Sequence, residues 1–235
     1  MAAQRLPGKP LADIGGQPMI VRVMRQAQAA ALGRVAVAAG DEEIVRAVTA
    51  AGGEAVLTDP ALPSGTDRVR AAADDLDPVR AHDLVINLQG DMPFVEPRVL
   101  ADSVALMRAQ PACDIGTCVT TEADPGDRTN PSVVKAILAM EPDGRSGRAL
   151  YFTRSTLYGD APVWRHLGIY IYRREALDRF TAAPPSPLER REGLEQLRAL
   201  EMGLSIWAAV VDEAPISVDT PEDLEAARAE AARRG

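Results

Sequence analysis

The stretch Leu84-Val85-Ile86-Asn87-Leu88-Gln89-Gly90-Asp91-Met92-Pro93-Phe94-Val95 contains the pattern that decides the fold. Its first five residues are mostly apolar, which is typical of a strand that is buried on both faces of a parallel sheet. Gln89, Gly90 and Pro93 then predict a turn. Asp91 therefore follows the carboxyl end of a central strand, where open α/β sheets bind their ligands. From the spacing alone, an aspartate that bonds its own backbone in a turn explains the residue equally well.

The composition of the 235-residue chain is that of a globular protein, with 46% hydrophobic and 26% charged residues. Its net charge of -8 and isoelectric point near 4.9 argue against a surface for nucleic acid or anionic membrane, because phosphates attract clustered positive charge. The sequence contains no long apolar run and no signal-type N-terminus. We therefore expect a cytoplasmic protein that binds neither nucleic acid nor membranes.

Strand and helix patterns alternate in the first half of the chain. We predict strands at residues 35–39, 54–58 and 84–88, with helices at residues 18–33, 41–52, from 66 onward and 99–108. Such alternation is typical of βαβ units and of a mostly parallel sheet. No Gly-x-Gly-x-x-Gly motif is present, which disfavours an enzyme that binds a nicotinamide or flavin dinucleotide.

The second half of the chain is richer in strands, which we predict at residues 115–120, 133–140, 149–153 and 166–172. An antiparallel excursion inserted in the parallel sheet fits this pattern best, and its apolar outer face would suit dimerisation. A helix from Pro187 to Gly203, a strand at 205–211 and a last helix after Thr220 close the chain. Cys113 and Cys118 would lie on opposite faces of a strand, so we expect neither a disulfide nor a metal pair.

Two loops have the composition of phosphate-binding segments. The loop Arg5-Leu6-Pro7-Gly8-Lys9-Pro10-Leu11 places two cations and a glycine between prolines, so that backbone N–H groups and side chains can wrap a phosphate. It is not a P-loop, because the Gly-Lys-Ser/Thr ending and the preceding strand are absent. Ser64-Gly65-Thr66-Asp67-Arg68 leads into a helix, where small residues expose backbone donors to a ligand. Plain N-capping by Ser64 or Thr66 also explains that loop.

A second aspartate follows a strand near the C-terminus. In the segment that begins at Val218, Thr220 is an N-cap, Pro221 takes the first helical position and Asp223 completes a capping-box pattern. The cap accounts for those residues, whereas Asp219 has no structural role in it. Asp219 therefore projects from the end of a strand in the same way as Asp91, and is the second site candidate.

Nine motifs, taken in order, resemble the 3-deoxy-manno-octulosonate cytidylyltransferase (CMP-Kdo synthetase) family. The resemblance extends from residue 5 to about residue 225. The motifs are Arg5-Leu6-Pro7-Gly8-Lys9-Pro10-Leu11, Ser64-Gly65-Thr66-Asp67-Arg68, Gln89-Gly90-Asp91, Asn130-Pro131 with Val134-Lys135, Leu150-Tyr151-Phe152 with Arg154, Arg165-His166-Leu167-Gly168-Ile169-Tyr170, Ser186-Pro187-Leu188-Glu189, Leu194-Glu195-Gln196-Leu197-Arg198 and Val218-Asp219-Thr220-Pro221-Glu222-Asp223.

The resemblance implies a fold and a reaction. The fold would be a three-layer, nucleotide-diphosphosugar-transferase-like (Rossmann-like) α/β domain with a mostly parallel sheet and an antiparallel, strand-rich excursion. Residues 1–235 would form this single domain, with a nucleotide-binding part at 1–111, a sugar-binding and dimerisation part at 112–185 and a closing part at 186–235. A homodimer would convert CTP and 3-deoxy-D-manno-octulosonate (Kdo) to CMP-Kdo and pyrophosphate for lipopolysaccharide synthesis, with Mg²⁺ as cofactor.

The resemblance also implies roles for single residues. The catalytic residues would be Asp91, Asp219, Lys9 and Arg5, with Mg²⁺ held by the two aspartates. The nucleotide-binding residues would be Leu6, Gly8, Ser64, Gly65 and Gln89. The sugar-binding residues would be Arg68, Arg154, His166, Tyr170, Glu195 and Gln196, and arginine suits the sugar carboxylate because it can bind both oxygens. Outside their motifs, His166 would instead be a core histidine, Glu195 and Gln196 part of a solvated helix face, and Lys135 a charge at a strand edge.

The sequence departs from the family pattern in three places. Met92 stands where the family usually has an acid, and the connection from Arg154 to Arg165 is short. The apolar first strand of the family, with a further arginine, is missing before the Arg5 loop. We therefore expect an in-frame upstream extension of roughly ten residues or more, the length of a strand and its approach. Two further functions stay open: a cytidylyltransferase for amino-Kdo or a sialic acid, and an inactive nucleotide-binding relative.

Overall fold

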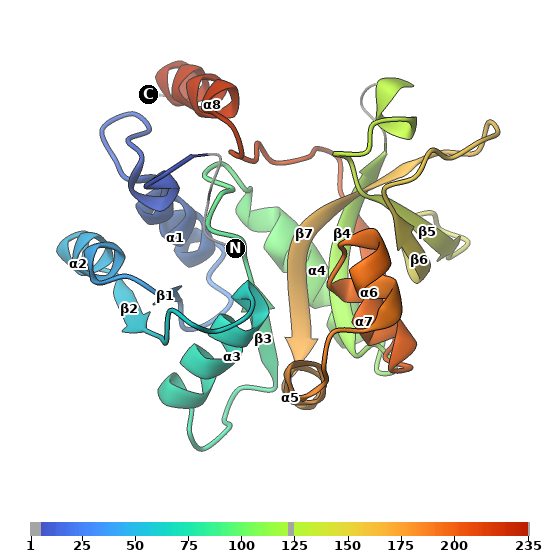
Figure 1. Cartoon of the computed structure of the whole chain (residues 1–235), viewed down its shortest axis with the longest axis horizontal. Coiled ribbons are helices and arrows are strands. Elements are labelled where there is room, and N and C mark those ends of the chain that lie inside the picture. Colours follow the sequence, from blue (N-terminus) through green and yellow to red (C-terminus); the bar gives the residue numbers. More distant parts are fainter. Residues whose placement is uncertain (1–5, 122–124, 235) are drawn as a thin grey trace. The chain divides into compact units, whose positions relative to one another are not determined.

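The computed structural model describes residues 6–121 and 125–234, and the chain divides into two units (Figure 1). The first unit comprises Met1–Ala81, Leu88–Leu100 and Pro215–Gly235, and the second comprises His82–Asn87 and Ala101–Ala214. The predicted three-part division at residues 111 and 185 stays a prediction. Within the described residues, no helix has both the length and the apolar character needed to cross a membrane.

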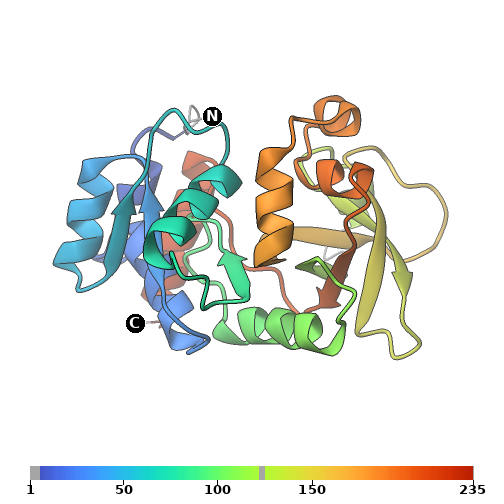
Figure 2. The ribbon, with the colours of Figure 1, turned by 90° about the horizontal axis from the view of Figure 1, so that it is seen from below.

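A pair of parallel strands forms the sheet of the first unit. Strands β1 (Ala36–Ala39) and β2 (Glu54–Leu57) pair in register from Ala36 opposite Glu54 to Ala39 opposite Leu57. Helices α1 (Met19–Ala29) and α2 (Glu42–Ala50) pack against the strands through Ile20, Val21, Met24 and Val48 (Figure 2). The strands and helices predicted from the alternating pattern are therefore confirmed here, although α1 ends before Gly33.

A second core of the first unit joins segments that are far apart in the sequence. Helix α8 (Pro221–Arg234) contributes Leu224, Ala227 and Ala231, which pack with Ile14, Met19, Phe94 and Val218. The predicted cap of α8 is present, because Asp223 N–H donates to Thr220 Oγ1 (3.2 Å) and Asp223 Oδ2 accepts from Thr220 N–H (2.9 Å). This core fixes the two segments that carry Asp91 and Asp219.

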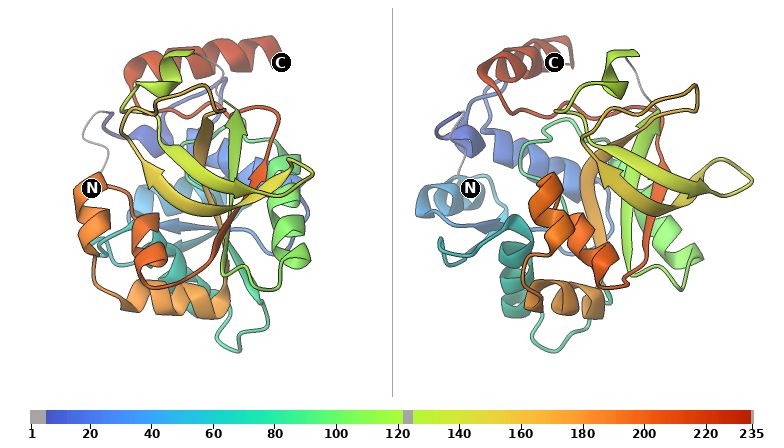
Figure 3. Two further views of the ribbon diagram at one scale, coloured as in Figure 1. Left: turned by 90° about the vertical axis from the view of Figure 1, so that its right-hand side faces the viewer. Right: turned by 45° about the vertical axis from the view of Figure 1, so that its right-hand side comes forward.

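Five strands of the second unit close into a ring. They are β4 (Ile115–Thr121), β5 (Lys135–Met140), β6 (Ser146–Thr153), β7 (Trp164–Arg173) and β8 (Ile206–Val210). With β3 (Leu84–Asn87) at one edge, the sheet order is β3-β7-β4-β8-β6-β5, and β5 also pairs with β7. Only β4 and β8 are parallel among these pairs. The long antiparallel pair β5 and β6 is seen in Figure 3. The predicted antiparallel excursion is thus confirmed.

Strand β3 (Leu84–Asn87) occurs where we predict it but in a different environment. It pairs antiparallel with β7, from Leu84 opposite Arg173 to Asn87 opposite Tyr170, and it lies at the edge of the six-stranded sheet within the described residues. Three of its four residues are half-buried. The expectation of a central, fully buried parallel strand is therefore wrong for the described part of the chain, because an apolar run does not reveal the direction of its partner.

Helices cover both faces of the strands in the second unit. Most of α4 (Pro97–Ala109) lies on one side and α5 (Arg174–Ala182) on the other (Figure 2). The core on the α5 side of the strands includes Phe152, Tyr170, Phe180 and Leu197. A Cβ at Gly116 of β4 would approach Met107 of α4 to 2.8 Å, so the absence of a side chain permits this close packing.

The predicted helix from Pro187 to Gly203 is broken. It forms α6 (Pro187–Glu192) and α7 (Gln196–Glu201), because Gly193 ends α6 with a left-handed φ of 65°. Helix α5 (Arg174–Ala182) was not expected from the sequence. Two short 3-10 helices, η1 (Lys9–Leu11) and η2 (Pro125–Arg128), lie in loops. Cys113 and Cys118 are both buried and free, as expected.

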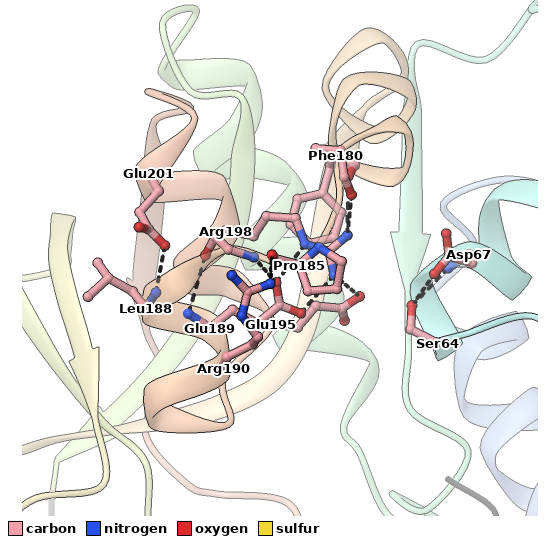
Figure 4. Close-up of polar contacts among 12 residues, drawn as sticks. Ser64, Asp67, Phe180, Pro185, Leu188, Glu189, Arg190, Glu195, Arg198 and Glu201 are labelled. Atoms are coloured by element: carbon pink, nitrogen blue, oxygen red, sulfur yellow. Dashed lines mark hydrogen bonds and ion pairs between the residues drawn. The ribbon is translucent and has the colours of Figure 1, made fainter.

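A buried arginine joins α5, α6 and α7. Arg198, 5% exposed, donates to both carboxylate oxygens of Glu189 at 2.8 Å (Figure 4). It also donates to the Ala183 carbonyl at 3.1 Å, and its guanidinium lies 4.5 Å from the centre of the Phe180 ring. Burial would raise the pKa of Glu189, but the bonds from Arg198 and Ser186 outweigh this effect and lower it. The ion pair therefore holds three helices together.

We predict that Arg198→Ala lowers the free energy of unfolding by about 3 to 5 kcal/mol, because it leaves the half-buried Glu189 carboxylate without its main partner. Denaturant unfolding followed by circular dichroism measures the change. Arg179→Ala is the matched control, since Arg179 is exposed on α5 and its loss should cost less than about 0.5 kcal/mol. Equal losses in the two variants would contradict the assigned role of the pair.

Candidate active site

One lysine bridges the two candidate aspartates in the first unit. The Lys9 ammonium lies 2.9 Å from Asp91 Oδ2 and 3.0 Å from Asp219 Oδ1. The side chain of Lys9 is 14% exposed, that of Asp91 is 21% exposed and that of Asp219 is 57% exposed. Two carboxylates from distant parts of the chain therefore face one point.

The backbone explains how these three groups meet. Gly8 has a left-handed φ of 70° and starts the 3-10 turn of η1, which places Lys9 at its first position. The Val218 N–H donates to the Asp91 carbonyl at 2.9 Å, so the two aspartate segments are hydrogen-bonded to each other. Asp219 N–H in turn donates to Asp223 Oδ2 at 3.0 Å, which anchors it to the start of α8. The cap of α8 therefore also positions Asp219.

The electrostatics of the cluster favour a bound cation. Partial burial would lower the pKa of Lys9, but attraction and hydrogen bonds from Asp91 and Asp219 outweigh burial and raise it. The ammonium thus stays charged between two carboxylates at neutral pH. One ammonium and two carboxylates leave the cluster a formal charge of −1, which attracts a further cation.

The residues of this cluster fit a magnesium ion. Asp91 Oδ1 is buried and has no hydrogen-bond partner within the described residues, so it is an acceptor oxygen with its coordination capacity unused. The same part of the chain contains no group of three or more His, Cys, Asp or Glu side chains suited to a metal. Two carboxylates are nevertheless what Mg²⁺ commonly takes from a protein, because water and substrate phosphates supply its other ligands.

Met92 does not supply a third acid to this cluster. Its side chain is 6% exposed and belongs to the buried interior of the chain. The apolar Met92 side chain packs at this position and needs no polar partner. An acid there would need a partner for its buried charge.

The predicted nucleotide-binding residues all lie in the first unit. Two of them are glycines whose backbone a ligand can approach. A Cβ at Gly8 or Gly65 would meet nothing within 4 Å, so both glycines leave room for a close ligand. The Leu6 carbonyl accepts the Lys9 N–H at 3.2 Å. Gln89 is half-buried and its side chain makes no hydrogen bond with other described residues. Arg5, predicted to be a catalytic residue, lies outside the described residues.

Ser64 has the structural role that the sequence offered as an alternative. It is the N-cap of α3 (Gly65–Leu76), and its hydroxyl accepts from Asp67 N–H at 3.2 Å and donates to Asp67 Oδ2 at 2.7 Å (Figure 4). The cap leaves Gly65 exposed at the N-terminus of a 12-residue helix. Capping and ligand binding at this loop are therefore compatible.

Arg68 also belongs to the first unit, whereas the other predicted sugar-binding residues belong to the second. Its Nη1 donates to Thr58 Oγ1 at 2.6 Å and to the Asp59 carbonyl at 3.3 Å. A Cβ at Gly40 would come within 2.6 Å of the same Nη1, so this glycine makes room for the guanidinium. Arg68 therefore fastens the loop after β2, and its predicted role toward a sugar stays a prediction.

Arg154 and Lys135 are coupled in the second unit. Arg154 Nη1 donates to the carbonyls of Pro131 (3.1 Å) and Ser132 (3.4 Å). Lys135 is fully buried, and its ammonium donates to the carbonyls of Asn130 and Arg154, each at 2.9 Å. Burial and repulsion from Arg154 lower the pKa of Lys135. Lys135 thus fixes the backbone that presents the Arg154 side chain.

His166 and Tyr170 lie together on β7. Their ring centroids are 5.5 Å apart, and the Phe152 ring meets His166 edge-on at 4.9 Å. Burial lowers the pKa of His166 to about 3, so the ring is neutral at physiological pH. Burial also raises the pKa of the Tyr170 phenol, with repulsion from Tyr172 and Glu195 adding to the shift.

The remaining predicted sugar-binding residues, Glu195 and Gln196, lie at the start of α7. Arg198 Nη2 is 3.7 Å from Glu195 Oε1, and Gln196 is 6% exposed. Gln196 is therefore not part of a solvated helix face, whereas the Glu195 side chain is 31% exposed. Repulsion from the Glu195 carboxylate contributes to the raised pKa of Tyr170.

Sequence reasoning missed the structural roles of two residues in the second unit, Lys135 at the Arg154 backbone and Thr117 at His166. Lys135 belongs to a recognised motif, yet the sequence alone did not separate it from a surface charge at a strand edge. Thr117 of β4 gave no signal, although its hydroxyl lies 3.0 Å from His166 Nε2. A threonine in a strand is common, and only the pairing of β4 with β7 reveals its partner.

Comparison with known sequences agrees with this arrangement. A model of the cytidylyltransferase family matches residues 1–206. The 3-deoxy-manno-octulosonate cytidylyltransferase of Parvibaculum lavamentivorans is 56% identical over 236 residues, which cover 100% of this chain and 90% of that protein. The protein of the same name from Rhodospirillum centenum is 53% identical over 97% of this chain and 89% of its own length.

Solved structures give the same family. A CMP:2-keto-3-deoxy-manno-octonic acid synthetase complexed with CTP matches with a TM-score of 0.91 and 36% identity, over 100% of this chain and 95% of that chain. A 4-diphosphocytidyl-2C-methyl-D-erythritol synthase from Anaerococcus prevotii, 13% identical with a TM-score of 0.61 over 94% of this chain and 92% of its own, shows a shared fold alone. The predicted α/β fold class is thus confirmed. The chain belongs to the 3-deoxy-manno-octulosonate cytidylyltransferase family.

Proposed function

We propose that this protein transfers the cytidylyl group of CTP to Kdo, giving CMP-Kdo and pyrophosphate. The observation that carries the proposal is the meeting of Lys9, Asp91 and Asp219, which gathers the charges that a nucleoside triphosphate and its metal require. Relatives that share half of the sequence over nearly the whole chain are named for this reaction. In the reaction, the anomeric hydroxyl oxygen bonds to the α-phosphorus, its proton is lost, and pyrophosphate leaves.

Charge neutralisation and positioning are the main tasks of the protein in such a transfer. We assign Asp91 and Asp219 as the residues that hold Mg²⁺. Bound there, the metal would neutralise phosphate charge and orient the triphosphate. Lys9 adds a positive charge next to the same carboxylates, so it can bind a phosphate oxygen. Gly8 and Gly65 offer backbone N–H groups without a side chain in the way.

In the second unit, we assign the sugar to Arg154, His166, Tyr170, Glu195 and Gln196. The Arg154 guanidinium suits the sugar carboxylate because it can donate two parallel hydrogen bonds. The neutral ring of His166 and the polar groups of Glu195 and Gln196 suit sugar hydroxyls, which both donate and accept.

The cellular setting belongs to the same proposal. A homodimer, a cytoplasmic location and a role in lipopolysaccharide synthesis are what the family resemblance implies. The negative net charge of -8 supports an environment away from anionic surfaces. Size-exclusion chromatography with light scattering tests the dimer, and a molar mass of one chain across micromolar concentrations would refute it.

Pyrophosphate release assayed over a panel of sugars tests the central proposal. With CTP and Mg²⁺, Kdo should give the fastest release, while an amino-Kdo and a sialic acid should be slower. Faster release with one of those sugars would identify a sister cytidylyltransferase instead. CTP binding in calorimetry without release on any of the sugars would identify an inactive relative.

We predict that Asp91→Asn and Asp219→Asn each lower kcat at least about 100-fold, because each removes a charge that holds the metal against the phosphates. The free energy of unfolding should fall by only about 1 kcal/mol or less, since the pairs with Lys9 are partly exposed. Pyrophosphate release measures the first effect and denaturant unfolding the second. Calorimetric titration with Mg²⁺ in the presence of CTP should show weaker metal binding.

Glu222→Gln is the matched control for these two variants. Glu222 is an exposed carboxylate in the first turn of α8, three residues from Asp219, so its loss changes the local charge without touching the cluster. Its turnover should stay within about twofold of the unmodified protein. Near-normal turnover in either aspartate variant would remove that aspartate from the metal site.

We predict that Arg154→Ala raises the KM for Kdo about 10-fold or more and leaves CTP affinity nearly intact, because a charge-assisted pair with the sugar carboxylate is lost. His166→Ala should act in the same direction. Steady-state kinetics with each substrate varied in turn measures both constants. Arg148→Ala, which removes an exposed arginine from β6, the strand that ends just before Arg154, should change neither. An equal loss of CTP affinity would contradict the assignment of Arg154 to the sugar.

A further inference from the structure

A bulge in β7 brings a buried threonine to His166. Thr117 pairs with Tyr170 and Cys118 with Leu167, so two residues of β7, Gly168 and Ile169, have no counterpart on β4. Because the insertion is two residues long, the alternation of faces is kept, and His166 and Tyr170 stay on the same face as Thr117. The Thr117 side chain is fully buried at this point.

The hydroxyl of Thr117 has three neighbours and one proton. Its Oγ1 lies 2.8 Å from the Ile169 carbonyl, 3.3 Å from the Leu167 carbonyl and 3.0 Å from His166 Nε2. Both carbonyls are acceptors only, so the hydroxyl proton points to them and mainly to Ile169. The contact with His166 is then satisfied only if Nε2 carries a proton and donates it to Oγ1.

The other ring nitrogen follows from this assignment. Burial lowers the pKa of His166 to about 3, so the ring carries one proton and not two. With that proton on Nε2, the second nitrogen Nδ1 is a hydrogen-bond acceptor. Nδ1 has no hydrogen-bond partner within the described residues, and the rings of Phe152 and Tyr170 hold the imidazole on two sides.

We propose that Thr117 is a positioning residue that fixes His166 in its Nε2–H form, so that Nδ1 accepts a hydrogen bond from a sugar hydroxyl and cannot bind the sugar carboxylate. The inference rests on the proposed function, because it divides the recognition of that sugar between two residues. Arg154 donates to the carboxylate, and His166 selects a group that donates. An acid without a hydroxyl at the matching place is then a poor substrate even when Arg154 can bind it.

The histidine form is tested by ¹⁵N-detected NMR of the unliganded protein. The chain has two histidines, so a His82→Gln variant identifies the His166 signals. We expect protonated Nε2 and unprotonated Nδ1 between pH 6 and pH 8. Thr117→Val should move the proton to Nδ1 or give a mixture of both forms, and Thr117→Ser should restore the original form. Protonated Nδ1 in the unmodified protein, or a Thr117→Val spectrum unchanged at His166, overturns the proposal.

Kinetics tests the consequence for the substrate. Thr117→Val should raise the KM for Kdo about 5- to 10-fold, the range expected for one neutral hydrogen bond, with the KM for CTP within twofold of normal. Thr117→Ser should recover the KM for Kdo. Thr120→Val is the matched control, because Thr120 is a buried threonine of β4 three residues away and so on the opposite face. A rise in both KM values, or an equal effect of Thr120→Val, overturns the positioning role.

Failure of the proposed function would look different. If the unmodified protein released no pyrophosphate with any sugar but His166 had the expected form, the assigned reaction would fall and the fixed tautomer would stand. If the protein were active on Kdo and His166 carried its proton on Nδ1, the reaction would stand and this inference would fall. If Thr117→Val did not fold, Thr117→Ala would serve as the variant without the hydroxyl, and protonated Nδ1 in the unmodified protein would still overturn the proposal.

Discussion

The attraction between the Lys9 ammonium and the carboxylates of Asp91 and Asp219 is the interaction on which the arrangement of the candidate active site depends. It joins residues that are 82 and 210 positions apart in the chain. Apolar packing alone, as in the core around Phe94 and Val218, would bring these segments together without fixing their charges. The ion pairs orient the two carboxylates toward Lys9. They leave Asp91 Oδ1 without a hydrogen-bond partner within the described residues, so this oxygen could bind the proposed metal ion.

The second unit relies on a different constraint, the satisfaction of polar groups inside a ring of strands. A bulge leaves backbone carbonyls without their usual ladder partners, and a buried carbonyl needs a donor. Thr117 supplies that donor at Leu167 and Ile169, and the same hydroxyl then determines which nitrogen of His166 is protonated. A structural requirement of the sheet and a chemical property of the site thus have one cause.

Local patterns in the sequence predicted much of the fold and part of the site. The alternation of strand and helix patterns predicted most elements. The position of an aspartate directly after each of two strands identified Asp91 and Asp219 as site candidates. Local patterns do not show which strands pair with each other. The sequence therefore predicted a central parallel position for β3, whereas β3 pairs with the antiparallel β7. The break at Gly193 depends on a left-handed φ that a glycine permits but does not require. The role of Thr117 depends on a register shift between strands, which no single stretch of sequence encodes.

The two lysines of the chain illustrate why residue type matters at both sites. Lysine is rare here, since 24 of the 26 basic residues are arginine, yet both Lys9 and Lys135 hold acceptors from separate segments. An ammonium is a compact charge whose three protons point in different directions, whereas a guanidinium donates from a flat fork that suits one carboxylate. An ammonium therefore suits acceptors that converge on one point from different segments, as at Lys9 and Lys135. The planar carboxylate of Glu189 takes Arg198 instead, and it is bound through both oxygens.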